Sequence, residues 1–174
     1  WATITVPINA KPTPGIFEVT PSNGMELTTI FELSASYWDD KDIPLTYEFH
    51  YSTKIGQSHT LLRARADSKA HSSYLPVADV AATGMTYLYL SVYDSKDAFA
   101  TVNTSVLVSP LIPSADILNS LLNDVQSTKA ISRGLQKAAM VADSLSKVDC
   151  SAAPNCTDLF RQSCSSTINT CGPC

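Results

Sequence analysis

The chain has 174 residues, of which 44% are hydrophobic and 16% charged, with ten prolines and six glycines. This composition is typical of a globular protein, and the length suits one domain with an appendage or two small domains. The formal net charge of −4 provides no basic surface for nucleic acid or an anionic membrane, and no apolar run approaches the roughly 18–20 residues that span a bilayer.

The N-terminal residues 1–11 resemble a strand without a partner. "WATITVPINAKP" and the later "FATVNTSVLVSP" both begin with an aromatic residue, Ala and Thr, continue with β-formers and end in Pro. Since the second is the natural last strand of a domain, we predict that the first is an additional strand. Its unpaired backbone groups would then favour pairing with another subunit. The assembly residues would be Thr3, Ile4, Thr5 and Val6. A disordered leader or a further strand of the same domain is the alternative. A chain that starts with Trp1 is also expected to be a processed or excerpted piece.

Residues 12–110 contain about seven short β-rich runs separated by turn residues. Strict alternation puts the apolar residues of each run on one face, which is typical of an antiparallel sandwich. Two such faces are Phe31, Leu33 and Ala35 in one run, and Leu88, Leu90 and Val92 in another. We predict an immunoglobulin-like sandwich, with a closed barrel as the alternative, and a four-residue hairpin loop at 94–97.

Residues 114–148 show helical periodicity. Ser114 is suited to cap a helix, and apolar residues recur at three- and four-residue spacing up to Val148. The stripe could pack back on the sandwich, pack as a helical hairpin, or contact a neighbour's copy through Leu121, Val125 and Leu135. We favour the first two arrangements, because the apolar stripe of a helix usually packs into the core of its own protein.

Residues 149–174 hold all of the cysteines: Cys150, Cys156, Cys164, Cys171 and Cys174. The last four residues, CGPC, spell a thioredoxin motif, but no helix follows them to lower a thiol pKa. A zinc site is disfavoured because the histidines lie far away in sequence. We therefore predict a disulfide-stabilised tail, in which the odd cysteine is free, pairs with another chain, or bonds a residue beyond Cys174.

The run "TPSNGMELTTIFELSASYWDDKDIPLTYEFHYS", followed by "YLYLSVYDSKDAFATV", resembles the PKD-type repeats of the REJ region in polycystin-1-like proteins. The tail resembles the cysteine-rich segment that follows such repeats in protist and algal surface proteins. The resemblance implies an extracellular modular glycoprotein with a PKD-type sandwich, and it implies no catalytic residue. One departure is that Trp38 is followed by "DDKDIPL" rather than a WDFGDG-type stretch.

Acidic residues cluster on two predicted loops that lie at the same end of an immunoglobulin-like sandwich. They are Asp39, Asp40, Asp42, Asp94 and Asp97. Their oxygens could converge on calcium, although ordinary solvated turns are the better interpretation because Asp is favoured in turns. Five tyrosines could form a sugar-binding face or simply pack on strands: Tyr47, Tyr51, Tyr87, Tyr89 and Tyr93.

N-glycosylation sequons occur at Asn103 and Asn155. Together these features predict a non-enzymatic extracellular glycoprotein without a cofactor, forming a homo-oligomer or fibre as part of a surface coat, ciliary appendage or fibril. A receptor ectodomain that binds carbohydrate or protein through its end loops is the alternative, and a thiol–disulfide oxidoreductase is a third.

Overall fold

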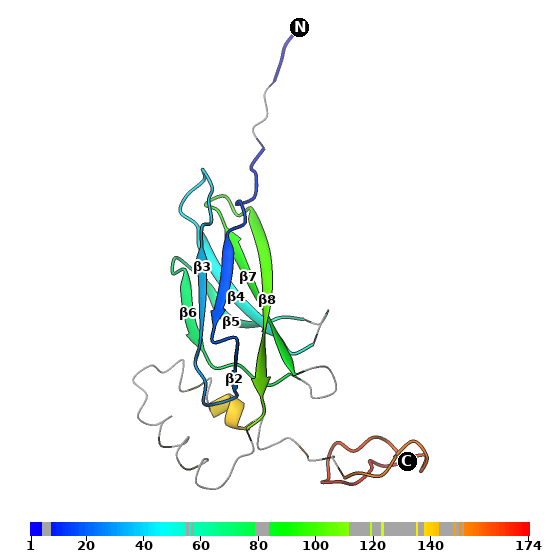
Figure 1. Ribbon diagram of the computed structural model, residues 1–174. Coiled ribbons are helices and arrows are strands. Elements are labelled where there is room, and N and C mark those ends of the chain that lie inside the picture. Colours follow the sequence, from blue (N-terminus) through cyan, green and yellow to red (C-terminus); the bar gives the residue numbers. More distant parts are fainter. Residues whose placement is uncertain are drawn as a thin grey trace.

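The computed structural model is a β-sandwich followed by a disulfide-bonded tail (Figure 1). It describes residues 1–4, 8–54, 56, 58–78, 84–111, 119, 123, 135, 138–142, 148, 150 and 152–174. The strands of the described residues are β1 (Ile16–Thr20), β2 (Asn23–Met25), β3 (Phe31–Ser36), β4 (Thr46–Ser52), β5 (Thr60–Ala66), β6 (Ala70–Ser73), β7 (Met85–Tyr93) and β8 (Phe99–Ser109).

The strands form two sheets, so the predicted sandwich is confirmed and the barrel is not formed. One sheet has the order β1-β3-β6 and the other β2-β8-β7-β4-β5. Pairing is antiparallel except between β2 and β8, which are parallel. The strands β5 and β6 belong to different sheets, so the chain crosses between the layers at residues 67–69.

The core lies between the sheets and consists of the alternating side chains that the sequence indicated. Phe31, Leu33 and Ala35 of β3 meet the inward residues of β4, β7 and β8. Leu88, Leu90 and Val92 are completely buried, and Trp38 belongs to the same cluster. Burial of apolar surface of this kind is the main stabilising term for a fold with so few charged residues.

Gly15 marks a close approach between β1 and the end of β3. A Cβ atom at this position would lie 2.1 Å from the carbonyl oxygen of Ser36 and 2.7 Å from Cδ1 of Trp38. Only hydrogen fits there, so Gly15 allows the first strand to enter against the core tryptophan.

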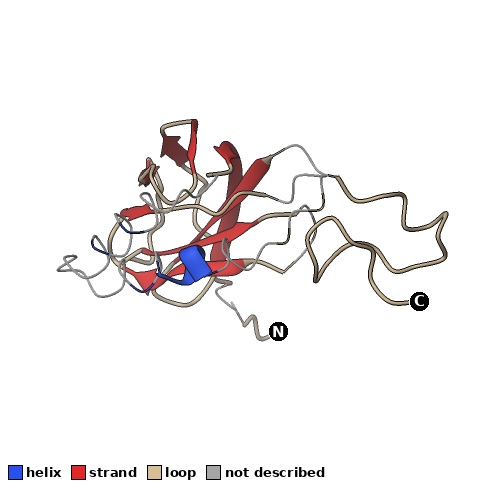
Figure 2. Ribbon diagram, turned by 90° about the horizontal axis from the view of Figure 1, so that it is seen from below, coloured by secondary structure: helices blue, strands red, loops and turns tan. Residues whose placement is uncertain are grey.

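A short helical segment, residues 138–142, packs on the opposite end of the sandwich from the N-terminus (Figures 1 and 2). Its Val141 is buried against Leu27, with Leu111 alongside. Packing back on the sandwich is thus observed for this segment. Most of the helix predicted over 114–148, including Leu121 and Val125, lies outside the described residues.

The tail is closed by two disulfides, Cys150–Cys164 and Cys156–Cys171, as predicted from the crowding of cysteines. Cys174 is exposed and bonds no other cysteine of this chain. Within the described residues, no helix has the length and apolarity needed to cross a membrane.

Candidate functional site

The turn between β7 and β8 is built around Asp94. The Asp94 backbone N–H donates to the carbonyl of Ala98 at 2.9 Å, and the Asp97 N–H donates to the carbonyl of Asp94 at 3.4 Å. The turn proper is therefore residues 95–97, one residue shorter than predicted. Asp97 has a φ of 65°, the left-handed conformation required at the last position of a three-residue hairpin loop. Aspartate tolerates this conformation better than most residues do.

The carboxylate of Asp94 is completely buried inside this turn. Its Oδ1 accepts hydrogen bonds from the backbone N–H groups of Lys96 at 2.8 Å and Ala98 at 3.0 Å. Its Oδ2 accepts one from the side-chain amide of Asn9 at 2.7 Å. The side chain thus holds the turn and the N-terminal segment together.

The loop between β3 and β4, residues 37–45, reaches the same end of the sandwich. The Ser95 backbone N–H donates to the Asp42 carbonyl at 2.9 Å, and Lys96 Nζ lies 2.7 Å from Asp42 Oδ1. The Asp42 backbone N–H donates to Asp40 Oδ1 at 2.7 Å. We call the surface formed by residues 37–45 and 94–98 the loop end.

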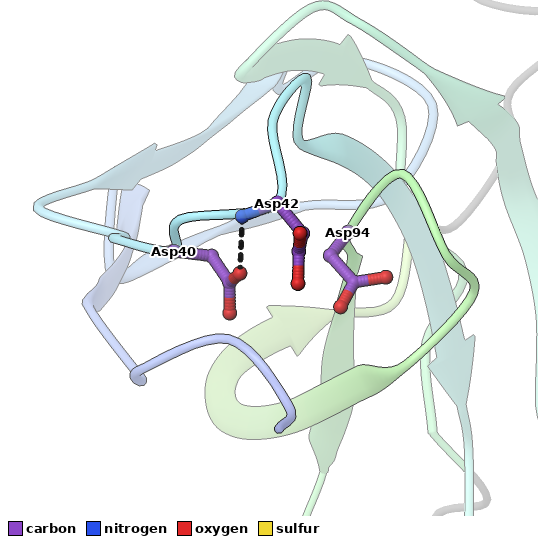
Figure 3. Close-up of side chains that lie close together, drawn as sticks. All are labelled: Asp40, Asp42 and Asp94. Atoms are coloured by element: carbon purple, nitrogen blue, oxygen red, sulfur yellow. Dashed lines mark hydrogen bonds between the residues drawn. The ribbon is translucent and has the colours of Figure 1, made fainter. Parts of the chain in front are cut away.

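Three carboxylates meet at the loop end. Asp40, Asp42 and Asp94 each place an oxygen within 4.8 Å of the others, and Figure 3 shows them side by side, from the two different loops. The other two predicted acids lie elsewhere in the network. Asp39 forms a backbone bridge with Thr13, and the exposed carboxylate of Asp97 pairs with Arg65.

The charges of this cluster are partly offset by groups of the protein itself. Burial opposes ionisation of Asp94, but the hydrogen bonds from Asn9, Lys96 and Ala98 and the nearby ammonium outweigh it and lower the pKa. The hydrogen bond to Asp42, together with the charge of that carboxylate, raises the pKa of Lys96. The ammonium of Lys96 is therefore a resident cation among the carboxylates. Carboxylate oxygens are also what Ca²⁺ prefers, and a calcium site here stays the alternative to ordinary solvated turns.

Asn9 was not identified from the sequence as part of this site. It lies 85 residues from Asp94 along the chain, within a segment that the sequence suggested would serve another subunit. Its Oδ1 is buried without a hydrogen-bond partner among the described residues. No sequence pattern links a single Asn to a distant turn, so this contact could be found only in three dimensions.

Arg65 of β5 binds residues of the loop end from the outer side of the five-stranded sheet. Its Nε donates to Thr46 Oγ1 at 2.6 Å and a terminal nitrogen donates to the Asp94 carbonyl at 3.1 Å. The guanidinium carbon lies 4.5 Å from the centroid of the Tyr93 ring, within the range of a cation–π interaction. Burial and a hydrogen bond to Glu48 raise the pKa of Tyr93.

Three of the five candidate tyrosines share one outer face, and the other two pack inward. Tyr87, Tyr89 and Tyr93 alternate with the buried residues of β7 and lie on the outer face of the five-stranded sheet. Tyr47 lies in the core instead, with 1% of its surface exposed, and Tyr51 packs against that core. On the outer face, the ring of His59 stacks on Tyr89 with centroids 3.7 Å apart.

The two sequons and those predicted assembly residues that the structure describes lie on exposed parts of the chain. Asn103 and Asn155 are both exposed. Ile4 and Leu135 are 85% and 67% exposed, and Thr3 is exposed as well. The remaining assembly residues, Thr5, Val6, Leu121 and Val125, lie outside the described residues. Of the N-terminal strand predicted over 1–11, residues 1–4 and 8–11 are described, and they belong to none of the strands β1–β8.

Known proteins similar to this chain agree with the resemblance seen in its motifs. The family model described as the REJ domain matches residues 1–147. The polycystin family receptor for egg jelly of Mus musculus is 30% identical over 146 residues, covering 76% of this chain and 7% of that protein. The protein of the same name from Homo sapiens is 31% identical over 129 residues, covering 67% of this chain and 6% of that protein.

Two solved structures are also similar to this chain. A carbohydrate-binding module of the β-sandwich superfamily has a TM-score of 0.44 at 16% identity and covers 63% of this chain and 38% of its own. The PKD1 domain of Vibrio anguillarum Epp has a TM-score of 0.35 at 22% identity and covers 60% of this chain and 100% of its own. The family itself follows from the sequence match, which spans both sheets and the segment after them: the chain belongs to the REJ domain family.

Proposed function

We propose that this chain is a non-catalytic module of the extracellular part of a polycystin-family receptor. The observation that carries the proposal is the REJ match over residues 1–147, joined to relatives whose names describe receptors. The two disulfides of the tail support an oxidising compartment outside the cytosol. The chain spans 7% and 6% of the mouse and human relatives it matches, and its role is that of one module among others.

The loop end is the surface that we propose for ligand contact. Its two loops are held by the hydrogen bonds of Asp42 and Asp94, so little ordering entropy would be lost on binding. The loop that carries Asp40 and Asp42 also exposes two large side chains, Tyr37 at 83% and Ile43 at 71%. An apolar contact flanked by fixed charges suits recognition of a carbohydrate or protein surface.

Secretion of the full chain behind a signal peptide tests the compartment. Peptide mapping without reduction should recover Cys150–Cys164 and Cys156–Cys171 from the medium. Retention of the chain inside the cell, or alkylation of all five cysteines in native material, would contradict the proposal.

Screening of the secreted chain on a glycan array and on egg-coat and cell-surface protein extracts tests the binding surface. We expect Tyr37→Ser with Ile43→Ser to abolish any binding. The control is Leu61→Ser, which changes an exposed apolar residue of β5 away from the loop end. Equal loss in the control would place the contact elsewhere.

Self-assembly into a coat, appendage or fibre is the second candidate. It is supported by the large apolar side chains that the N-terminal segment exposes, among them Ile4 and Ile8. Sedimentation velocity over a range of concentrations tests it, with Ile4→Ser and Ile8→Ser expected to reduce association. A monomer at every concentration would exclude strand exchange of this chain alone.

A further inference from the structure

Asn103 is placed on β8 so that a bulky group attached to it would not disturb the fold. The residue is exposed, while its neighbour Val102 packs against the core. No hydrogen bond engages the Asn103 side chain within the part of the chain that the structure describes. Ser105, the hydroxyl residue of the sequon, lies on the same face of the strand because side chains alternate with a period of two.

Asn155, the other sequon, is differently placed. Its side-chain amide donates to Asp158 Oδ2 at 2.8 Å, and its Oδ1 accepts from the Thr157 backbone N–H at 3.3 Å. The middle residue of that sequon, Cys156, is bonded to Cys171. A glycan on Asn155 would therefore compete with local contacts, whereas one on Asn103 would replace none.

The cross-strand partner of Asn103 is Tyr89 of β7. Side chains directly opposite one another in an antiparallel pair have Cβ atoms about 4.5–5.5 Å apart. Tyr89 is flanked on its other side by His50 of β4, and His59, from the segment before β5, stacks on its ring. The strand order β8-β7-β4 puts His50 on the side away from Asn103, and His59 occupies one face of the Tyr89 ring. A group attached to Asn103 would therefore cover the side of the half-buried Tyr89 that is turned toward β8.

We propose that Asn103 carries an N-linked glycan whose first sugar packs on Tyr89 and covers the outer face of the five-stranded sheet. In the attachment step, Asn103 Nδ2 forms a bond to C1 of an N-acetylglucosamine supplied by a lipid pyrophosphate-linked oligosaccharide. The bond from C1 to the pyrophosphate oxygen breaks, the lipid pyrophosphate leaves, and the amide loses one proton. The apolar C–H face of a pyranose matches the face of an aromatic ring, as other apolar groups do.

This inference rests on the proposed extracellular location, and it would leave the loop end as the uncovered binding surface. The outer tyrosines would then meet the protein's own sugar rather than a ligand.

The first test is occupancy in the secreted full chain. Enzymatic release of N-glycans in heavy-oxygen water should leave a mass label on the peptide that contains Asn103, and Ser105→Ala should remove it. Secreted chain with both disulfides formed and Asn103 unlabelled would overturn the inference while leaving the proposed function intact.

The second test is contact with Tyr89. We expect the glycan to raise Tm by a few degrees, roughly 2–5 °C, in the chain with Tyr89. In each background the increase in Tm is measured as the difference between the chain with Ser105 and the chain with Ser105→Ala. This difference should disappear when Tyr89→Thr is introduced. It should persist with Tyr87→Thr, which makes the same change two residues away. An equal increase in all three backgrounds would overturn the packing on Tyr89.

Discussion

The side-chain amide of Asn9 donates a 2.7 Å hydrogen bond to Oδ2 of Asp94, and 85 residues separate the two. This bond attaches the segment before β1 to the turn between β7 and β8. The carboxylate that accepts it also organises the turn and is fully buried. The geometry of the loop end therefore depends on one buried acid.

Replacement of Asp94 by Asn should destabilise the sandwich. Both oxygens of Asp94 accept hydrogen bonds. The substitution turns one of them into an NH₂ group, which cannot accept, so a buried donor is left without its partner. We expect Tm to fall by roughly 5–10 °C. Asp97→Asn makes the same chemical change three residues later on an exposed side chain, and its effect should be small because surface ion pairs contribute little. Equal losses of Tm in the two variants would contradict this account of Asp94.

The same residue should make stability depend on acid. The folded-state pKa of Asp94 lies below its ordinary value of 3.8. Its stabilisation is therefore complete above the ordinary pKa and is lost as pH falls through the folded-state pKa. We expect the difference in unfolding free energy between the wild type and Asp94→Asn to be constant above about pH 5 and to shrink below about pH 4. A difference that stays constant into strong acid would show that Asp94 does not titrate in this way.

Calcium should have little effect on the wild-type chain, since the Lys96 ammonium already lies 2.7 Å from Asp42. We expect millimolar Ca²⁺ to leave Tm unchanged in the wild type. In Lys96→Gln the carboxylates lose this cation, so any calcium-dependent increase in Tm should appear there. A calcium-dependent increase in the wild type that Asp42→Asn abolishes would instead assign a metal site to this cluster.

Gly15→Ala should be strongly destabilising. The added methyl group would meet the Ser36 carbonyl oxygen at 2.1 Å, and backbone atoms cannot move aside as a flexible side chain can. We expect a loss of about 2–4 kcal/mol by chemical denaturation. Gly56→Ala is the contrast: that position has a φ of +74° and nothing within 4 Å of the added atom, so it should cost only about 1 kcal/mol of backbone strain. A loss at position 15 no larger than at position 56 would refute the close approach.

The two disulfides should stabilise the tail by comparable amounts. They join cysteines separated by 14 and 15 residues, and closing loops of this length is worth about 3 kcal/mol in the chain-entropy account. Cys156→Ser or Cys150→Ser should increase protease cleavage of the tail, whereas Cys174→Ser should not. Labelling with a maleimide before reduction should modify Cys174 alone.

Much of the architecture could be predicted from local pattern. The alternation of Phe31, Leu33 and Ala35 identified an inward face because the side-chain period of a strand is two, whatever its neighbours are. The crowding of cysteines in 150–174 likewise predicted disulfides, because a short segment with few apolar residues needs covalent closure. Connectivity was beyond the sequence, since five cysteines allow many pairings.

The sequence by itself determined the sandwich, the direction in which Asn103 points and the end at which the acidic loops meet. These features follow from the period-two alternation of the strands and from the loop arrangement of an immunoglobulin-like sandwich. The tertiary structure alone decided that Asp40, Asp42 and Asp94 approach one another while Asp39 and Asp97 bond elsewhere. It also decided that Asn9 and Arg65 join that end and that Tyr47 is internal. Such contacts depend on positions brought together across the chain by packing, and no local pattern encodes a distance between loops.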